Sequence, residues 1–120
     1  MEIKTVRHII NLILENGKTQ KCSKHSLFSQ VENLEIKATD HKVNNKFWRF
    51  IFDEKKQALT SLYECSFYFL DLTQNIPMEA ILFCENGYID ALELYSCDGQ
   101  LFETVDFDNI EIVPYDNSVQ

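Results

Sequence analysis

The second half of this sequence contains no basic residue. All eleven lysines and arginines lie at or before Lys56 together with seven acidic residues, whereas the twelve acidic residues after Lys56 have no lysine or arginine among them. The formal net charge of −8 at pH 7 therefore belongs to the C-terminal half. A chain with this charge is repelled by phosphates, so we expect no direct contact with nucleic acid. The asymmetry instead favours electrostatic recognition of a basic partner.

Glycine and proline are also scarce, with three and two residues in a chain of 120. This scarcity argues against low-complexity linkers, and the length fits a single domain (1–120) with one core. No apolar run approaches the ~18 residues of a membrane span, and no N-terminal signal region is visible. The four cysteines form no Cys-x-x-Cys pair. We therefore expect a cytoplasmic protein with reduced thiols and no membrane association.

The apolar pattern predicts an α+β fold, in which an N-terminal helix packs on a curved antiparallel sheet of about six strands connected as a β-meander. Residues 1–17 are predicted to be helical, because apolar residues recur at three- and four-residue spacing up to Asn16-Gly17. A polar connection with a short turn around Leu27, Phe28 and Val31 follows. Residues 34–113 are predicted to form the sheet, and residues 114–120 a frayed tail.

Turn residues divide the predicted sheet. Asn44-Asn45 favours a hairpin, and Asn75 to Pro77 should interrupt the chain because proline lacks a backbone donor. Asn86-Gly87 and Asp98-Gly99 favour two further hairpins. The register at Asn86-Gly87 stays open, since a two-residue turn pairs Phe83 with Asp90 and a bulged turn pairs it with Ile89. The predicted strands are 34–43, 46–54, 61–72, 79–85, 88–96 and 101–107.

Motifs for catalysis or cofactor binding are weak. Asn16–Thr19 matches the end of a phosphate-binding loop, but Leu12 stands where its first glycine belongs, and the motif closes a helix instead of opening one. Cys22-x-x-His25 supplies only two of the four ligands of a structural zinc site. Trp48 and Phe50 alternate like core residues, which we favour over base stacking. We expect no cofactor, no metal and no enzymatic activity.

Carboxylates gather around the last two predicted hairpins. Like charges on neighbouring strands cost up to ~1 kcal/mol per opposed pair, and a cationic partner would relieve that repulsion. A solvated face explains the same residues without a partner, so both interpretations stay open. Tyr88 and Tyr95 are candidate aromatic anchors, because tyrosine is enriched at binding hot spots, with sheet packing as their alternative role. The predicted charge donors are Asp90, Glu93, Asp98, Glu103, Asp106 and Asp108.

The same region, "PMEAILFCENGYIDALELYSCDGQ" (Pro77 to Gln100), resembles small bacterial immunity proteins encoded beside polymorphic toxins, including those of contact-dependent growth inhibition systems. The shared features are a Glu-Ala-apolar strand, an Asn-Gly-Tyr turn and the "LELYSCDG" run. The resemblance implies a non-enzymatic inhibitor that binds the toxin domain of its own system in the cytoplasm. A nuclease toxin would offer a basic surface for this acidic one. The expected partner is thus a cognate toxin domain, bound by a monomer or weak dimer.

Two other classes of function stay open. The first is a small-molecule-binding module with a pocket between helix and sheet, lined by Phe67, Tyr68 and Phe69. The second is a small hydrolase, because two carboxylates suffice for acid–base hydrolysis. Its candidate residues are Glu79, Asp90 and Glu93.

Overall fold

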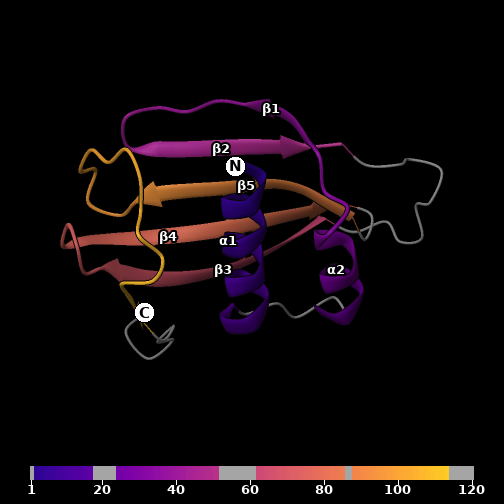
Figure 1. Cartoon of the computed structure of the whole chain (residues 1–120), viewed down its shortest axis with the longest axis horizontal. Coiled ribbons are helices and arrows are strands. Elements are labelled where there is room, and N and C mark those ends of the chain that lie inside the picture. Colours follow the sequence, from indigo (N-terminus) through magenta and orange to yellow (C-terminus); the bar gives the residue numbers. More distant parts are fainter. Residues whose placement is uncertain (1, 18–23, 52–61, 86–87, 114–120) are drawn as a thin grey trace.

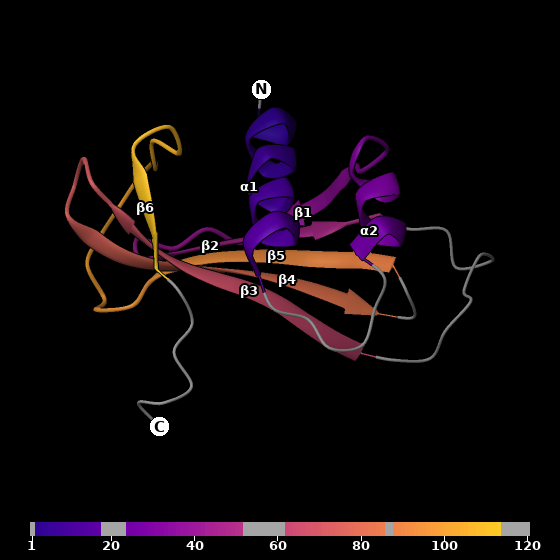
Figure 2. The same cartoon turned by 90° about the horizontal axis from the view of Figure 1, so that it is seen from below.

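The computed structural model describes residues 2–17, 24–51, 62–85 and 88–113. The predicted α+β fold is confirmed: an N-terminal helix packs on a six-stranded antiparallel sheet, and a short second helix joins it. Both helices lie on the same face of the sheet (Figures 1 and 2). The elements are α1 (Glu2–Asn16), α2 (Lys24–Val31), β1 (Ile36–Thr39), β2 (Asn45–Phe50), β3 (Leu62–Asp71), β4 (Ile76–Glu85), β5 (Tyr88–Ser96) and β6 (Ile110–Val113).

The strands run in the order β1-β2-β5-β4-β3-β6, which departs from a simple meander. β3, β4 and β5 are consecutive neighbours, but β2 pairs with β5 and β6 pairs with β3. The predicted strand at 101–107 is therefore wrong, because β2 occupies the edge of β5 that this strand needed. Residues 97–109 instead form an irregular segment whose Phe102 is buried in the core. Gly99 adopts a positive φ of 79°, but its turn leads into this segment and not into a hairpin.

Two further turns differ from the prediction. The β1–β2 turn is Val43–Asn44, since Lys42 pairs with Asn45 across it. Pro77 does not interrupt the chain but lies inside β4, opposite Leu70 of β3. The preceding turn, 72–75, is capped by Asp71, whose buried Oδ1 accepts hydrogen bonds from the backbone amides of Thr73 (2.9 Å) and Gln74 (3.1 Å). This side chain satisfies the donors that would otherwise have no partner in the tight turn.

The register of β4 and β5 matches neither predicted pairing of Phe83. Glu85 pairs with Tyr88 across a two-residue connection, whose Asn86 and Gly87 lie outside the described residues. A β-bulge then shifts the pairing, so Phe83 lies opposite Ala91 and not opposite Asp90 or Ile89. Asp90 is the extra residue of this bulge. The backbone amide of Ile89 donates to the side chain of Gln30 on α2 at 2.9 Å, which ties the bulge to the second helix.

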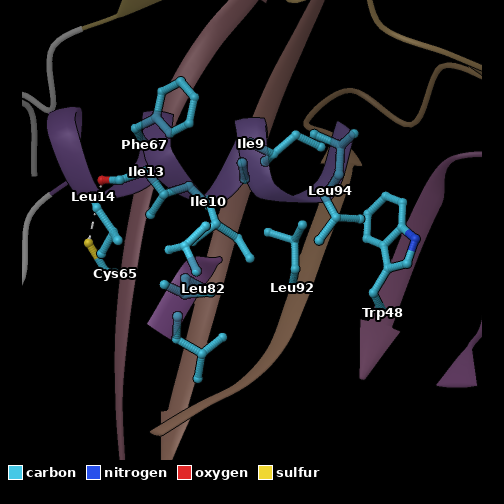
Figure 3. Close-up of a cluster of buried hydrophobic side chains, with 14 of the residues drawn as sticks. Ile9, Ile10, Ile13, Leu14, Trp48, Cys65, Phe67, Leu82, Leu92 and Leu94 are labelled. Atoms are coloured by element: carbon cyan, nitrogen blue, oxygen red, sulfur yellow. Dashed lines mark hydrogen bonds between the residues drawn. The ribbon is translucent and has the colours of Figure 1, made fainter. Parts of the chain in front are cut away.

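The core lies between the helices and the sheet (Figure 3). The apolar stripe of α1 packs against β3 and β4, and Trp48 and Phe50 of β2 are buried beside it, as the alternation predicts. Gly17 follows α1 where the chain passes close to β3. A Cβ atom there would lie 2.6 Å from the Ile13 carbonyl oxygen and 2.8 Å from the Cys65 sulfur. Close packing therefore selects this glycine, and its φ does not lie in the left-handed region.

Some predicted features fall on parts of the chain that the structure does not describe. These are the frayed tail at 114–120, Cys22 of the Cys-x-x-His pair, and the end of the strand predicted at 46–54. Neither described helix is long and apolar enough to cross a membrane.

Candidate functional site

One face of the sheet carries no described helix, and we call it the outer face (Figure 2). The strand registers place its side chains in three rows that run across β3, β4, β5 and β2 in that order. The rows are Tyr68–Glu79–Tyr95–Asn45, Ser66–Ile81–Glu93–Phe47 and Glu64–Phe83–Ala91–Arg49.

Aromatic side chains cover much of the outer face. The rings of Phe47 and Phe83 lie 6.4 Å apart between centroids, and the Arg49 guanidinium lies 5.6 Å from the Phe47 ring centroid. Both phenylalanines are only half-buried, whereas the small Ala91 beside them is 1% exposed. A contiguous, partly exposed apolar patch of this kind is typical of an interaction surface.

Two carboxylates are set among these rings. Glu79 is only 7% exposed, and the Tyr95 hydroxyl opposite donates a hydrogen bond to it. Burial, and then this hydrogen bond, raise the pKa of Tyr95. Glu93 accepts a hydrogen bond from the Asn45 amide at 2.6 Å. Among the described residues the only ion pair joins Glu2 to His41, so Glu79 and Glu93 are held by uncharged donors.

The other predicted site residues do not share this face as one group. Asp90 sits in the β-bulge, and Tyr88 lies opposite Glu85 at the far end of the outer face. Asp98 is exposed in the turn after β5, where a hydrogen bond from the Gln100 side chain lowers its pKa. The remaining three, Glu103, Asp106 and Asp108, belong to the irregular segment 97–109, and the last two line a hollow with Lys4 and His8 of α1. The structure thus brings only Glu93 and Tyr95 together among the predicted contacts.

A second candidate site, which sequence reasoning missed, lies between the start of α1, β2 and the irregular segment. Trp48 Nε1 donates to the Glu2 carboxylate at 3.2 Å, and His41 Nε2 lies 3.3 Å from the same oxygen. The backbone amide of Phe47 points at His41 Nδ1 (3.3 Å), so Nε2 carries the proton and donates to Glu2. The hydrogen bonds from Trp48 and then His41 lower the pKa of Glu2.

The structure separates the residues predicted for the small-molecule pocket, and it brings together two of the three residues predicted for a hydrolase. Phe67 and Phe69 are buried in the core, while Tyr68 between them points to the outer face, so the three cannot line one pocket. The hydrolase candidates Glu79 and Glu93 are diagonal neighbours on the outer face, each held by a hydrogen-bond donor. Within the described part of the chain, no three His, Cys, Asp or Glu residues are grouped so as to hold a metal ion.

Comparison with protein-family models, with curated proteins and with solved structures found no match to this chain. Function is therefore argued from the charge and geometry of the chain itself.

Proposed function

We propose that this chain is an immunity protein that binds the toxin domain of its own system, a basic nuclease, through the outer face and neutralises it stoichiometrically. The observation that carries the proposal is the setting of Glu79 and Glu93: two carboxylates among partly exposed aromatic rings, with no basic partner in the described part of the chain. A cation of another molecule that reaches this surface would meet two carboxylates that form no ion pair with a described residue.

The chemistry of a nuclease surface matches this face. Nucleases hold phosphates with lysine and arginine, so a protein that presents carboxylates can occupy the same cations. Tyr68 and Tyr95 flank Glu79 in its row, where their rings can also contact an arriving guanidinium or ammonium group. Phe47, Ile81 and Phe83 supply the apolar area that excludes water around such contacts.

The charge asymmetry supports the same partner. Twelve acidic residues and no lysine or arginine follow Lys56, and the sheet places Glu64, Glu79 and Glu93 from that half on one face. Acidic residues elsewhere in this half extend the negative field beyond the contact area. Such a field accelerates encounter with a basic protein by ~10- to 1,000-fold at low salt.

The direct test is binding and neutralisation of the toxin domain encoded beside this chain. Purified protein should form a one-to-one complex and abolish nuclease activity, with an association rate that falls steeply between about 0.05 and about 0.5 M NaCl because of screening. Glu93→Lys should weaken the complex by ~10- to 1,000-fold, since it places a cation against the partner's cations. Glu32→Lys is the matched control, because Glu32 is exposed next to α2 and away from the outer face.

The immunity function and the outer face as its interface can be rejected separately. Absence of any complex with the toxin domain at low salt rejects immunity. A complex that tolerates Glu93→Lys but is lost in Glu103→Lys rejects the outer face and moves the interface to the irregular segment.

A further inference from the structure

One lysine of β2, Lys46, starts on the side of the sheet that faces the core. Lys46 lies opposite Leu94 and alternates with the buried Trp48 and Phe50, so its side chain starts from the face that packs against α1. Its ammonium group lies 3.0 Å from the Lys42 carbonyl oxygen and 5.4 Å from the centroid of the Phe102 ring. No carboxylate within the described residues forms an ion pair with it. Lys46 is only partly buried, so its stem can lie along the apolar core while its ammonium group stays near water.

The space around Lys46 is a cavity of about 300 Å³. Its walls include Ile9 of α1, Trp48 of β2 and Leu94 of β5, which gather at one end of the core (Figure 3). Phe102 and Phe107 of the irregular segment complete the apolar lining. This volume falls at the lower end of the range for small-molecule sites, which are mostly apolar with a few placed polar groups.

Two lysines lie at the mouth of this cavity. A larger hollow of about 730 Å³ shares Lys46 and Phe102 with it and adds Lys42. Glu2 lies at the same place, but Trp48 and His41 already donate to its carboxylate. Glu103 lines both spaces as well, and no ion pair within the described residues joins it to Lys42 or Lys46. The two lysines and the two carboxylates balance over the whole lining, so the positive charge is local to the ammonium groups of Lys42 and Lys46.

We infer that this cavity binds a small organic carboxylate with an aromatic or branched aliphatic body. The body occupies the space between Ile9, Trp48 and Leu94, where it removes apolar surface from water. The carboxylate lies at the mouth and accepts charge-assisted hydrogen bonds from Lys46. This site is separate from the outer face, and it does not depend on whether the chain binds a toxin.

Trp48 gives a direct readout, because it is the only tryptophan in the chain and forms one wall of the cavity. The probe is 4-phenylbutyrate, with 4-phenylbutanamide as its uncharged analogue and 4-phenylbutylamine as its cationic one. The acid should change Trp48 fluorescence saturably and bind about tenfold tighter than the amide, because only the acid forms a charge-assisted hydrogen bond. No saturable change with the acid, or tighter binding of the amine, overturns the inference.

Variants test the two parts of the site, the ammonium group of Lys46 and the apolar cavity, one at a time. Lys46→Gln should remove the preference for the acid over the amide, whereas Lys37→Gln, on exposed β1, should leave it unchanged. Val105→Phe should fill the cavity and abolish binding of every probe, while Val113→Phe on exposed β6 should not. Circular dichroism and thermal melts check that each variant is folded. Binding that survives both Lys46→Gln and Val105→Phe contradicts the assignment.

Discussion

The hydroxyl group of Tyr95 donates a hydrogen bond to the carboxylate of Glu79, directly across the β4–β5 pair. Glu79 is 7% exposed, so its charge has lost most of its water and depends on this donor. The Tyr95–Glu79 pair therefore stabilises the outer face and also holds one of the carboxylates that we propose to bind the partner.

Tyr95→Phe should destabilise the fold by ~1–3 kcal/mol, because it leaves the buried Glu79 carboxylate without its donor. Urea unfolding followed by circular dichroism measures the loss. The variant Glu79→Leu combined with Tyr95→Phe should recover part of it, since both polar partners are then replaced by apolar groups. A loss in the double variant equal to the sum of the losses in Tyr95→Phe and Glu79→Leu would show that the hydrogen bond makes no contribution.

The same pair predicts a loss of stability in alkaline solution. The pKa of Tyr95 is raised above its ordinary value of 10.0, first by burial and then by Glu79. A raised pKa means that the unfolded chain loses the phenol proton first. The contribution of the protonated Tyr95 side chain to the free energy of unfolding is thus complete below pH 10. It is lost as the pH rises toward the folded-state pKa. The urea midpoint at about pH 11 should be lower than that at about pH 9, and this difference should be larger in the natural protein than in Tyr95→Phe. Equal differences in the two proteins would contradict the prediction.

The helix and the central strands are predictable because their signals are local. The spacing of Val6, Ile9, Ile10, Ile13 and Leu14 defines the buried stripe of α1, and alternation defines β3, β4 and β5. The pairing of β2 with β5 is not predictable in this way. It joins residues far apart in the chain, and the Asp98-Gly99 signal indicates a turn without indicating which strand pairs next.

In the candidate sites, too, the residues with a local signal are predictable and those placed by long-range pairing are not. Glu93 and Tyr95 are found from alternation along one strand, but their neighbours on the outer face depend on the register of β2 and on the bulge at Asp90. The cavity was missed because Glu2 meets His41 and Trp48 from 39 and 46 residues away. One local signal was present: Lys46 alternates with Trp48 and Phe50, which places a cation on the buried side of a strand.

Gly17→Ala should destabilise the protein by ~1–3 kcal/mol, the usual cost of overpacking a core contact. The added Cβ would lie 2.8 Å from both the Cys65 sulfur and the Ser66 carbonyl oxygen, so α1 must move away from β3. Gly99 is the matched control, because nothing lies within 4 Å of its Cβ position and only its positive φ restricts substitution. Gly99→Asn should therefore be tolerated, since asparagine adopts this conformation readily. Thermal melts that show Gly17→Ala as harmless as Gly99→Asn would reject close packing at Gly17.

Glu2 predicts a titration of Trp48 fluorescence in acid. The pKa of Glu2 is lowered from its ordinary value of 4.5 by hydrogen bonds from Trp48 and then His41. Because the pKa is lowered, the ionised Glu2 side chain stabilises the fold above pH 4.5, and this stabilisation is lost as the pH falls through the folded-state pKa. Protonation removes the acceptor of the Trp48 indole, so emission should change with a midpoint below pH 4.5 while the fold persists. Glu2→Gln should abolish this step, whereas Glu15→Gln, exposed near the end of α1, should retain it. A step that survives in Glu2→Gln would mean that another group titrates beside Trp48.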